Sequence, residues 1–444
     1  MARILAAGLA LLLTAAMVSA QDISRARLGP APRVTDLSKL GTAAPSQIPE
    51  GLPPVDRNSR QAVVDFYNTV YVPALAATND WNGSVPGCVA GTTGAAYTSA
   101  TMDMVNYFRA MTGLPAAVTH EAVKDGKTQA AALMMTANNA LNHTPPLSWT
   151  CYTADGADAA GHSNLALGAA GPWAIWLYVS DPGSENYRLG HRRWILYPPQ
   201  VEVGTGSTGN ANALWVLGPF GSRPATPQTV PWPPAGFVPY QTVYARWSFS
   251  VNTGASVSFT SATVSMARGS TPISLAVLQN ENGYGDNTIG WEPSGLSFSG
   301  GLPDDAISVQ VSNVLVGGVP TNYSYTVTVI DPARVPPPVF TDDPLVPRTT
   351  RPKAVHILEL RQAVATLRAR YGLGAWVWTD AALTPGSTVV KAVHLADLRT
   401  ALAQVYVAAA RPAPVYTTPN LVARSTIITA TDVAELRAAV LGVW

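Results

Sequence analysis

The pattern of apolar and polar positions predicts a helix-rich region over residues 57–210. Three segments within it, residues 58–72, 99–113 and 121–142, carry apolar residues at the spacing of one helix face. Pro73 is expected to stop the first helix, because proline cannot continue the hydrogen-bond ladder. Short extended pieces complete the region, so a mixture of helices and a small sheet is predicted.

The pattern changes to strict alternation over residues 235–332. Short runs of apolar and polar residues alternate there with a period of two, and glycine, asparagine and proline separate the runs. This arrangement is typical of an antiparallel, immunoglobulin-like β-sandwich. The clearest run alternates Trp247, Phe249 and Val251 with Ser248 and Ser250.

A 38-residue repeat occupies residues 340–444. The stretches "AVHILELRQAV", "AVHLADLRTAL" and "ATDVAELRAAV" begin at Ala354, Ala392 and Ala430. Each has the pattern of an amphipathic helix, so three helical units that pack on one another are predicted. The residues at the matching cap position, His356, His394 and Asp432, are expected to cap their helices and to have no catalytic role.

Two features of the sequence bear on where the protein is located: the N-terminal segment and the two cysteines. Residues 1–20 have the pattern of a signal peptide, a basic residue followed by an apolar run and small residues, with an uncleaved anchor as the alternative. Residues 21–56 are rich in proline and are predicted to be a linker. Cys88 and Cys151 are the only cysteines, and export favours a disulfide between them over two free buried thiols. We therefore expect a secreted or cell-surface protein without a transmembrane span in its mature chain.

The net charge of 444 residues is only +1, and 12% of residues are charged. A nucleic-acid partner or an acidic membrane surface therefore has no electrostatic support. Familiar catalytic motifs are also missing: "HEAVK" lacks the second histidine of a zinc protease, and no GxSxG stretch is present. The "GTGSTG" stretch, residues 204–209, lacks the context of a phosphate-binding loop and is predicted to be a turn.

Four of the six histidines, His120, His143, His162 and His191, lie in the helix-rich region. Around them the stretches "VNYFRAMTGL", "AALMMTANNALNHTPP", "HSNLALG", "AIWLYVSDPG", "GHRRWILYPP" and "VEVGTG" follow one another in order. This ordered set resembles the bacterial branch of the CAP superfamily (SCP-like extracellular domains) over about residues 97–206. The resemblance implies an α-β-α sandwich with a cleft. The β-sandwich and the three-unit helical repeat predicted from the sequence pattern follow it, so a multidomain chain is expected.

The resemblance also implies a cleft with two histidines and two acidic residues. His143 and His191 match the histidines, and Asp181 matches one acid, with Glu185 as the alternative. Ser163 stands where the family has its other acid, so one carboxylate is missing. The remaining set could bind zinc or another divalent cation, or carry out acid–base chemistry, or simply hold helices in register through hydrogen bonds. Arg192 and Arg193 are expected to form salt bridges or to cover neighbouring surface, and not to contact a ligand, and Trp194 is expected in the core.

The function that the resemblance implies is that of an extracellular binding module with a histidine-lined cleft. Lipids, glycans and proteins are all ligands within the family, so the ligand class stays open, and the C-terminal modules would present the domain or attach it to the cell envelope. The alternative is a hydrolase of cell-wall or peptide substrates that uses His143, His191 and Asp181. A third possibility is a structural adhesin.

Overall fold

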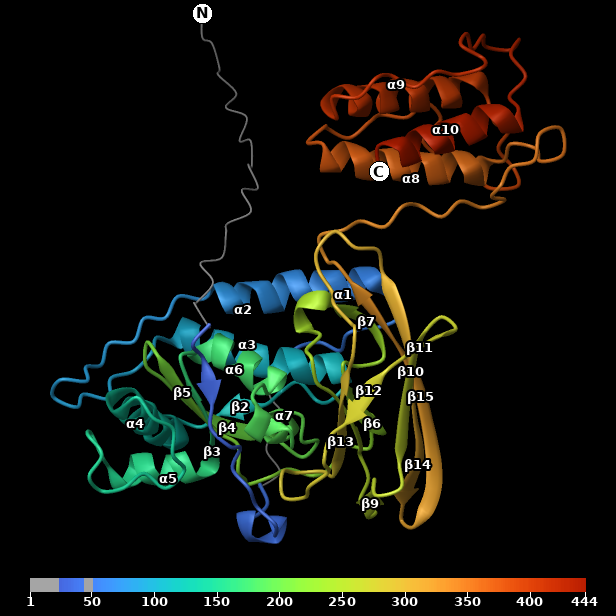
Figure 1. Cartoon of the computed structure of the whole chain (residues 1–444). Helices are drawn as coiled ribbons and strands as arrows, with labels where there is room; N and C mark the ends of the chain where they lie inside the picture. The colour runs from blue at the N-terminus through green and yellow to red at the C-terminus, as the bar shows by residue number, and fades with distance from the viewer. Residues whose placement is uncertain (1–23, 44–50) are drawn as a thin grey trace, which may run out of the picture. The chain divides into compact units, whose positions relative to one another are not determined.

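The computed structural model describes residues 24–43 and 51–444. The chain divides into two compact units, the first ending at Arg334 and the second comprising Val335–Trp444 (Figure 1). The predicted signal peptide, residues 1–20, lies outside the described residues. Within the described ranges, no helix is long and apolar enough to cross a bilayer.

A five-stranded sheet organises the first unit. Its strand order is β1-β3-β5-β4-β2, and neighbouring strands are antiparallel except for the parallel pair β2 and β4. The "GTGSTG" stretch lies largely in β4, so its prediction as a turn was wrong. A Cβ at Gly206 would lie 2.2 Å from the backbone nitrogen of Gln129, so glycine lets this strand approach a helix closely. The strands are β1 (Arg27–Leu28), β2 (Thr119–His120), β3 (Ser163–Leu167), β4 (Glu202–Ser207) and β5 (Ala211–Trp215).

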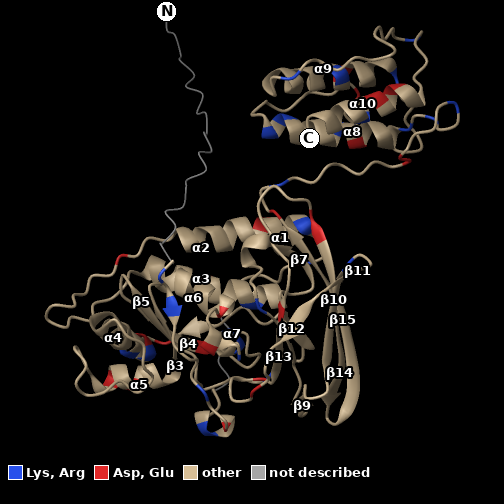
Figure 2. Ribbon diagram, in the orientation of Figure 1, with Lys and Arg blue, Asp and Glu red and all other residues tan. Residues whose placement is uncertain are grey.

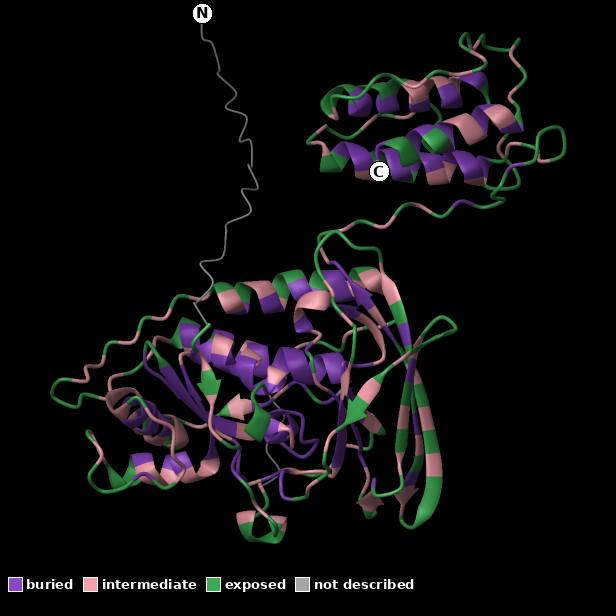
Figure 3. Cartoon of the chain, viewed as in Figure 1, coloured by how far each residue is buried: buried purple, intermediate pink, exposed green. Residues whose placement is uncertain are grey.

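Helices cover both faces of this sheet and make three layers. Because side chains alternate along a strand, Leu165 and Leu167 of β3 pack with one pair of helices while Ala166 packs with the other. Figure 3 shows two of these helices, α3 and α6, buried along most of their length. The first pair is α4 (Ala122–Asn138) and α5 (Ala154–His162), and the second is α3 (Ala95–Thr112) and α6 (Gly171–Ser180).

The helix predicted to stop at Pro73 continues past it. The helical segment runs through α1 (Arg60–Phe66), a π-helical turn (Tyr67–Tyr71) and α2 (Val72–Ala76). Pro73 lies in the first turn of α2, directly after the π-helical turn, in which the N–H of Val72 bonds to the carbonyl oxygen of Tyr67. The wider turn accommodates the proline within the continuing helix. The expectation that it ends the helix was therefore wrong.

Residues 24–43, which were predicted to be part of a linker, pack against the sheet and its helices. Arg27 pairs with Leu167, and Leu28 with Ala166, as an added edge strand. Ala31 is only 8% exposed. The linker prediction was wrong for this stretch because a proline-rich chain is extended and can lie along a sheet edge.

Two further sheets enclose a second core in the first unit. One has the order β11-β10-β14-β15-β7, with β9 pairing with β14, and the other has the order β12-β13-β8-β6. Apolar residues of both sheets, such as Trp247, Ile289 and Val309, form one cluster. The strands are β6 (Thr229–Trp232), β7 (Gly236–Pro239), β8 (Trp247–Val251), β9 (Val257–Ser258), β10 (Thr263–Arg268), β11 (Thr271–Ile273), β12 (Leu275–Val277), β13 (Thr288–Pro293), β14 (Asp305–Val316) and β15 (Val319–Ile330).

These sheets are not separated from the helix-rich region as the sequence suggested. The ring centroids of Trp232 in β6 and Phe108 in α3 are 5.0 Å apart, in an edge-to-face contact. Arg192 donates to the Ser248 hydroxyl of β8 at 3.0 Å. The predicted boundary between residues 210 and 235 therefore lies inside one compact unit, because buried aromatic and arginine side chains cross it.

The second unit contains α8 (Ala354–Arg370), α9 (Ala392–Ala408) and α10 (Ala430–Gly442), which share one apolar core. The helices begin at the positions where the sequence stretches repeat. His356, His394 and Asp432 lie three residues after the N-cap, and each accepts the backbone N–H of the N-cap residue. Figure 2 shows basic and acidic residues interspersed along these helices.

Candidate functional site

Asp181 and His191 form a fully buried pair between α6 and α7 (Gly190–Ile195). One carboxylate oxygen of Asp181 lies 2.8 Å from Nδ1 of His191. The other accepts the backbone N–H groups of His191 at 3.1 Å and Arg192 at 3.3 Å. Asp181 therefore fixes the orientation of the ring and also satisfies backbone donors at the start of α7.

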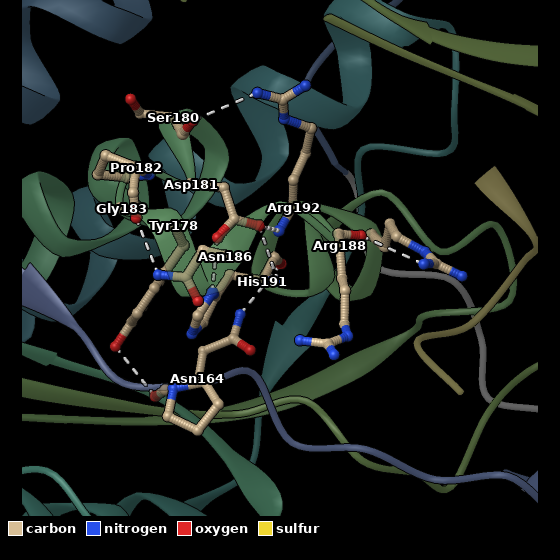
Figure 4. Close-up of polar contacts among 12 residues, drawn as sticks. Asn164, Tyr178, Ser180, Asp181, Pro182, Gly183, Asn186, Arg188, His191 and Arg192 are labelled. Atoms are coloured by element: carbon tan, nitrogen blue, oxygen red, sulfur yellow. Dashed lines mark hydrogen bonds and ion pairs between the residues drawn. The ribbon is translucent and has the colours of Figure 1, made fainter. Parts of the chain in front are cut away.

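The remaining contacts of His191 come from α6 and β3. The ring of Tyr178 stacks on the imidazole with centroids 5.7 Å apart, and the Asn164 amide donates to the carbonyl oxygen of His191 at 3.1 Å. Figure 4 shows the ring of His191 between Asp181 and Asn164. Three buried atoms here have no hydrogen-bond partner: Nε2 of His191, Oδ1 of Asn164 and Oγ of Ser163. An unsatisfied buried polar atom costs about 1–3 kcal/mol, so these three atoms are candidates for ligand contacts.

His143, which follows α4, faces two backbone carbonyl groups. Its Nδ1 lies 2.6 Å from the oxygen of Ala160, and its Nε2 lies 2.6 Å from the oxygen of Pro30. Burial lowers the pKa of His143, the two carbonyl groups oppose that shift, and the charge of His191 adds to it. The two predicted histidines are thus near enough to interact electrostatically.

Two other predicted residues make their contacts elsewhere. Glu185 is exposed in a 3₁₀ turn (Ser184–Asn186), where its carboxylate accepts the Ser184 hydroxyl at 3.4 Å. His162 lies at the end of α5, with Nδ1 2.8 Å from the carbonyl oxygen of Asp158 and its ring stacked on Trp215. Of the two candidate acids, Asp181 is the one that contacts a site histidine.

The donor groups around His143 and His191 do not fit zinc in the arrangement described. Both nitrogens of His143 face carbonyl oxygens, and the Asp181 carboxylate is occupied by one ring nitrogen and two backbone N–H groups. Within the described ranges, no three histidine, cysteine or acidic side chains are grouped to hold a metal. The zinc site therefore stays a prediction.

The two arginines after His191 are buried and donate to backbone carbonyl groups, so they do not cover neighbouring surface as expected. Arg192 donates to the carbonyl oxygen of Val179 at 2.6 Å, and Arg193 to those of Glu281 and Asp286 at 2.8 and 2.9 Å. Burial lowers the pKa of each guanidinium to about 10. The "GHRRW" stretch thus ties α7 to neighbouring loops, and Trp194 is fully buried as expected.

Sequence reasoning missed Arg109, which lies on the buried side of α3. Its guanidinium is fully buried and donates five hydrogen bonds, all to backbone carbonyl oxygens. Burial lowers its pKa to about 9. The available signal was an arginine between apolar neighbours in "YFRAM". Its acceptors are Pro115, Ile195, Tyr197, Pro198 and Gln200.

A hollow of about 680 Å³ lies between the start of α3 and the start of α4. It is lined by His120 and Asp125, whose side chains form an ion-pair contact. Asp125 also accepts the backbone N–H of Thr205 at 2.7 Å. The histidine that was dismissed as part of a zinc-protease motif therefore has a structural partner of its own.

The predicted disulfide is present. Cys88 and Cys151 are bonded, with their Cα atoms 5.1 Å apart. The bond links the loop before α3 to the loop between α4 and α5. It therefore joins the segment before α3 to the segment between His143 and His162.

Comparison with known proteins adds one match. Residues 102–217 match the family model described as CAP, the cysteine-rich secretory protein family. The match begins within α3 and ends just after β5, so it covers the helices and strands that carry His143, Asp181 and His191. No curated protein matches the chain.

Proposed function

Because residues 102–217 form a CAP domain, we propose that this chain is a secreted, SCP-like extracellular protein of the bacterial branch. Its CAP domain would act as a binding module through the residues around His143 and His191. Proteins of this family are typically extracellular, and the disulfide supports an oxidising compartment. The ligand would be a lipid, a glycan or a protein.

One observation carries the preference for binding over catalysis. His143 makes its Nε2 contact to the backbone carbonyl oxygen of Pro30, a residue far away in the sequence. A neutral imidazole has one N–H group, so His143 can donate to one of the two carbonyl groups that it faces and is placed to hold a polypeptide backbone by that hydrogen bond. Both of its nitrogens face backbone oxygens, so in this arrangement neither faces a substrate.

The test compares the full chain with His143→Ala, and uses His162→Ala as the matched control. His162 is a half-buried histidine of the same domain that also faces a carbonyl group. Co-sedimentation with phosphatidylglycerol vesicles and with insoluble cell-wall glycan, together with binding to immobilised peptides, separates the three ligand classes. We expect His143→Ala to lose about tenfold in affinity for one class, with an unchanged melting temperature, while His162→Ala binds normally. Unchanged binding in all three assays would contradict the proposal.

The hydrolase alternative has one observation in its favour. Asp181 orients His191 through Nδ1 and leaves Nε2 without a partner, which is the arrangement of a general base with its orienting carboxylate. If the chain is a hydrolase, it releases products from cell-wall or peptide substrates, and His191→Gln abolishes turnover without unfolding the chain. Our proposal expects no turnover above that of the His191→Gln variant.

The three helical units of residues 340–444 are proposed to attach the protein to the cell envelope or to present the CAP domain. The compact unit that contains them begins at Val335, so a truncation after Arg334 removes it whole. We expect the truncated chain to keep its CAP domain folded and to lose retention at the cell surface. An insoluble truncated chain, or one retained at the cell surface like the full chain, would contradict the role proposed for the helical units.

A further inference from the structure

Residues 25–34, here called the N-terminal arm, lie along the CAP domain beside the candidate site. Figure 1 shows β1 of this arm next to β3 at the edge of the five-stranded sheet. Arg27 also donates to the carbonyl oxygen of Asn139 at 2.6 Å. An extended chain that adds a strand to a sheet edge is one of the recurring ways in which proteins bind peptides.

Beyond β1, the arm makes two contacts through the carbonyl oxygens of its prolines. His143 Nε2 lies 2.6 Å from the carbonyl oxygen of Pro30, and Nε1 of Trp194 donates to that of Pro32 at 2.7 Å. Proline itself has no N–H group, so neither residue leaves a donor unsatisfied, and its fixed φ keeps the segment extended.

The residue between the prolines fits only because it is small. Ala31 packs against Gly190, where a Cβ would lie 2.6 Å from the Cβ of Ala31. A similar close approach occurs at Gly168, where a Cβ would lie 2.7 Å from the Cα of Ala26. The CAP domain therefore has two glycines where the arm passes, and both would clash with it if they carried side chains.

We propose that this surface is a peptide-binding site for an extended chain with a proline–small residue–proline core. Pro30, Ala31 and Pro32 of the chain's own N-terminal arm occupy it. The contacts are made to the backbone of the arm and require only a small central residue, so a separate peptide with the same pattern can make all of them. This inference rests on the proposed binding function and names its ligand class. His191, whose Nε2 is buried and unpartnered, directly follows Gly190 in the chain.

The experiment releases the arm in the full chain and offers its core as a free peptide. Ala31→Trp puts a large side chain against Gly190 and is expected to unseat the arm. Arg25→Trp is the matched control, because Arg25 is an exposed residue of the same arm. Trypsin cleavage after Arg27 reports whether the arm is seated, and we expect it to be about tenfold faster in Ala31→Trp than in the control.

Binding is measured by fluorescence anisotropy with the labelled peptide LGPAP, the sequence of residues 28–32. We expect it to bind Ala31→Trp and to bind the wild-type chain and Arg25→Trp about tenfold less tightly, because their site is occupied. The peptide LGAAA, which lacks both prolines, should bind about tenfold less tightly than LGPAP. Adding Trp194→Phe, which removes the indole N–H but keeps an aromatic ring, should weaken binding of LGPAP to Ala31→Trp by a similar factor.

A released arm without binding of LGPAP would overturn the inference, as would equal binding of LGPAP and LGAAA. If Ala31→Trp fails to fold, the wild-type chain gives the answer. LGPAP contains no site for trypsin, and at several millimolar it exceeds the effective concentration of a tethered segment, which is on the order of 1 mM. It should then displace the arm and speed cleavage after Arg27, and an unchanged rate would overturn the inference. Failure of LGPAP while His143→Ala still loses another ligand would leave the proposed binding function intact and reject only the peptide class.

Discussion

The carboxylate of Asp181 contacts His191 twice, at the ring nitrogen Nδ1 and at the backbone N–H, with distances of 2.8 and 3.1 Å. Both side chains are fully buried. The carboxylate therefore positions the histidine ring and also accepts backbone N–H groups at the start of α7. Removing it would leave the imidazole nitrogen and two backbone N–H groups without acceptors in the protein interior.

We predict that Asp181→Ala lowers the free energy of unfolding of the first unit by about 3 kcal/mol or more, because breaking a buried pair leaves its partner uncompensated. Glu185→Ala is the matched control, since Glu185 is exposed and was the other candidate acid. Urea denaturation followed by tryptophan fluorescence measures both variants. Equal destabilisation by the two substitutions would show that the contact to His191 has no special weight.

The zinc prediction has its own measurement. The donor groups described do not fit a metal, so we expect purified full-length protein to contain less than one zinc per chain after dialysis, with the same content in the His143→Ala/His191→Ala double variant. Elemental analysis by mass spectrometry gives the content directly. One tightly held zinc per chain that disappears in the double variant would establish the metal site and require His143 to leave its carbonyl acceptors.

Arg109 supplies the third prediction. Its five hydrogen bonds hold the end of α7 and the chain that follows it, at Ile195, Tyr197, Pro198 and Gln200, as well as Pro115. Lysine has three donors and cannot reproduce this planar arrangement. We expect Arg109→Lys to cost on the order of 3 kcal/mol of stability.

Arg223→Lys is the comparison for Arg109→Lys, because Arg223 is a partly exposed arginine that pairs with Asp286. It should lose much less stability in the same urea titration. A smaller loss in Arg109→Lys than in Arg223→Lys would mean that water or other donors satisfy the carbonyl groups after α7.

The disulfide should stabilise the first unit selectively. Cys88 and Cys151 are 63 positions apart, and closing a loop of that length contributes about 4 kcal/mol in the chain-entropy model. Reduction should therefore shift the unfolding transition of the first unit to lower urea. The second unit contains neither of the chain's two cysteines, so its transition is the internal control. A shift of both transitions, or of neither, would contradict the assignment.

Periodicity predicted the elements of this fold better than their boundaries. The helical spacing of residues 121–142 corresponds to α4, but the helix ends at Asn138, because Asn139 adopts the left-handed conformation before the prolines are reached. The glycines of "GTGSTG" looked like turn residues, whereas Gly206 is a strand residue that packs against α4. A local pattern cannot show that a glycine is needed for packing against an element distant in sequence.

In the candidate site too, some features could be predicted from the sequence and others could not. Resemblance to the family singled out His143, His191 and Asp181, and the structure places Asp181 on His191. The contact between His143 and Pro30 could not be predicted, because the two residues are separated by 113 positions and the proline-rich segment had every local feature of a linker. Long-range contacts of backbone carbonyl groups leave no signature in side-chain composition.

The second unit provides a pH-dependent prediction. Lys353 and His356 lower the pKa of Asp342, and Lys391 and His394 lower that of Asp380 in the same way. A carboxyl group whose pKa is lower in the folded state stabilises that state fully above the pKa of the unfolded chain, about 3.9, and this contribution is lost as pH falls through the folded-state pKa. The stability of the second unit should therefore be unchanged from about pH 7 to 5 on account of these groups and should decline below about pH 4.

The Asp342→Asn/Asp380→Asn double variant tests the assignment. It removes both ionisable carboxyl groups while it keeps side chains of nearly the same shape, so the unfolding transition of the second unit should depend less on pH below about pH 4. In the third repeat Thr418 occupies the position of these acids, and Asp432 is the acid at the helix start, its pKa lowered by hydrogen bonds from Thr429 and Thr418 despite its burial. That repeat should therefore retain some acid sensitivity in the double variant. A pH profile identical to that of the wild-type chain would place the acid sensitivity of the unit in other carboxyl groups.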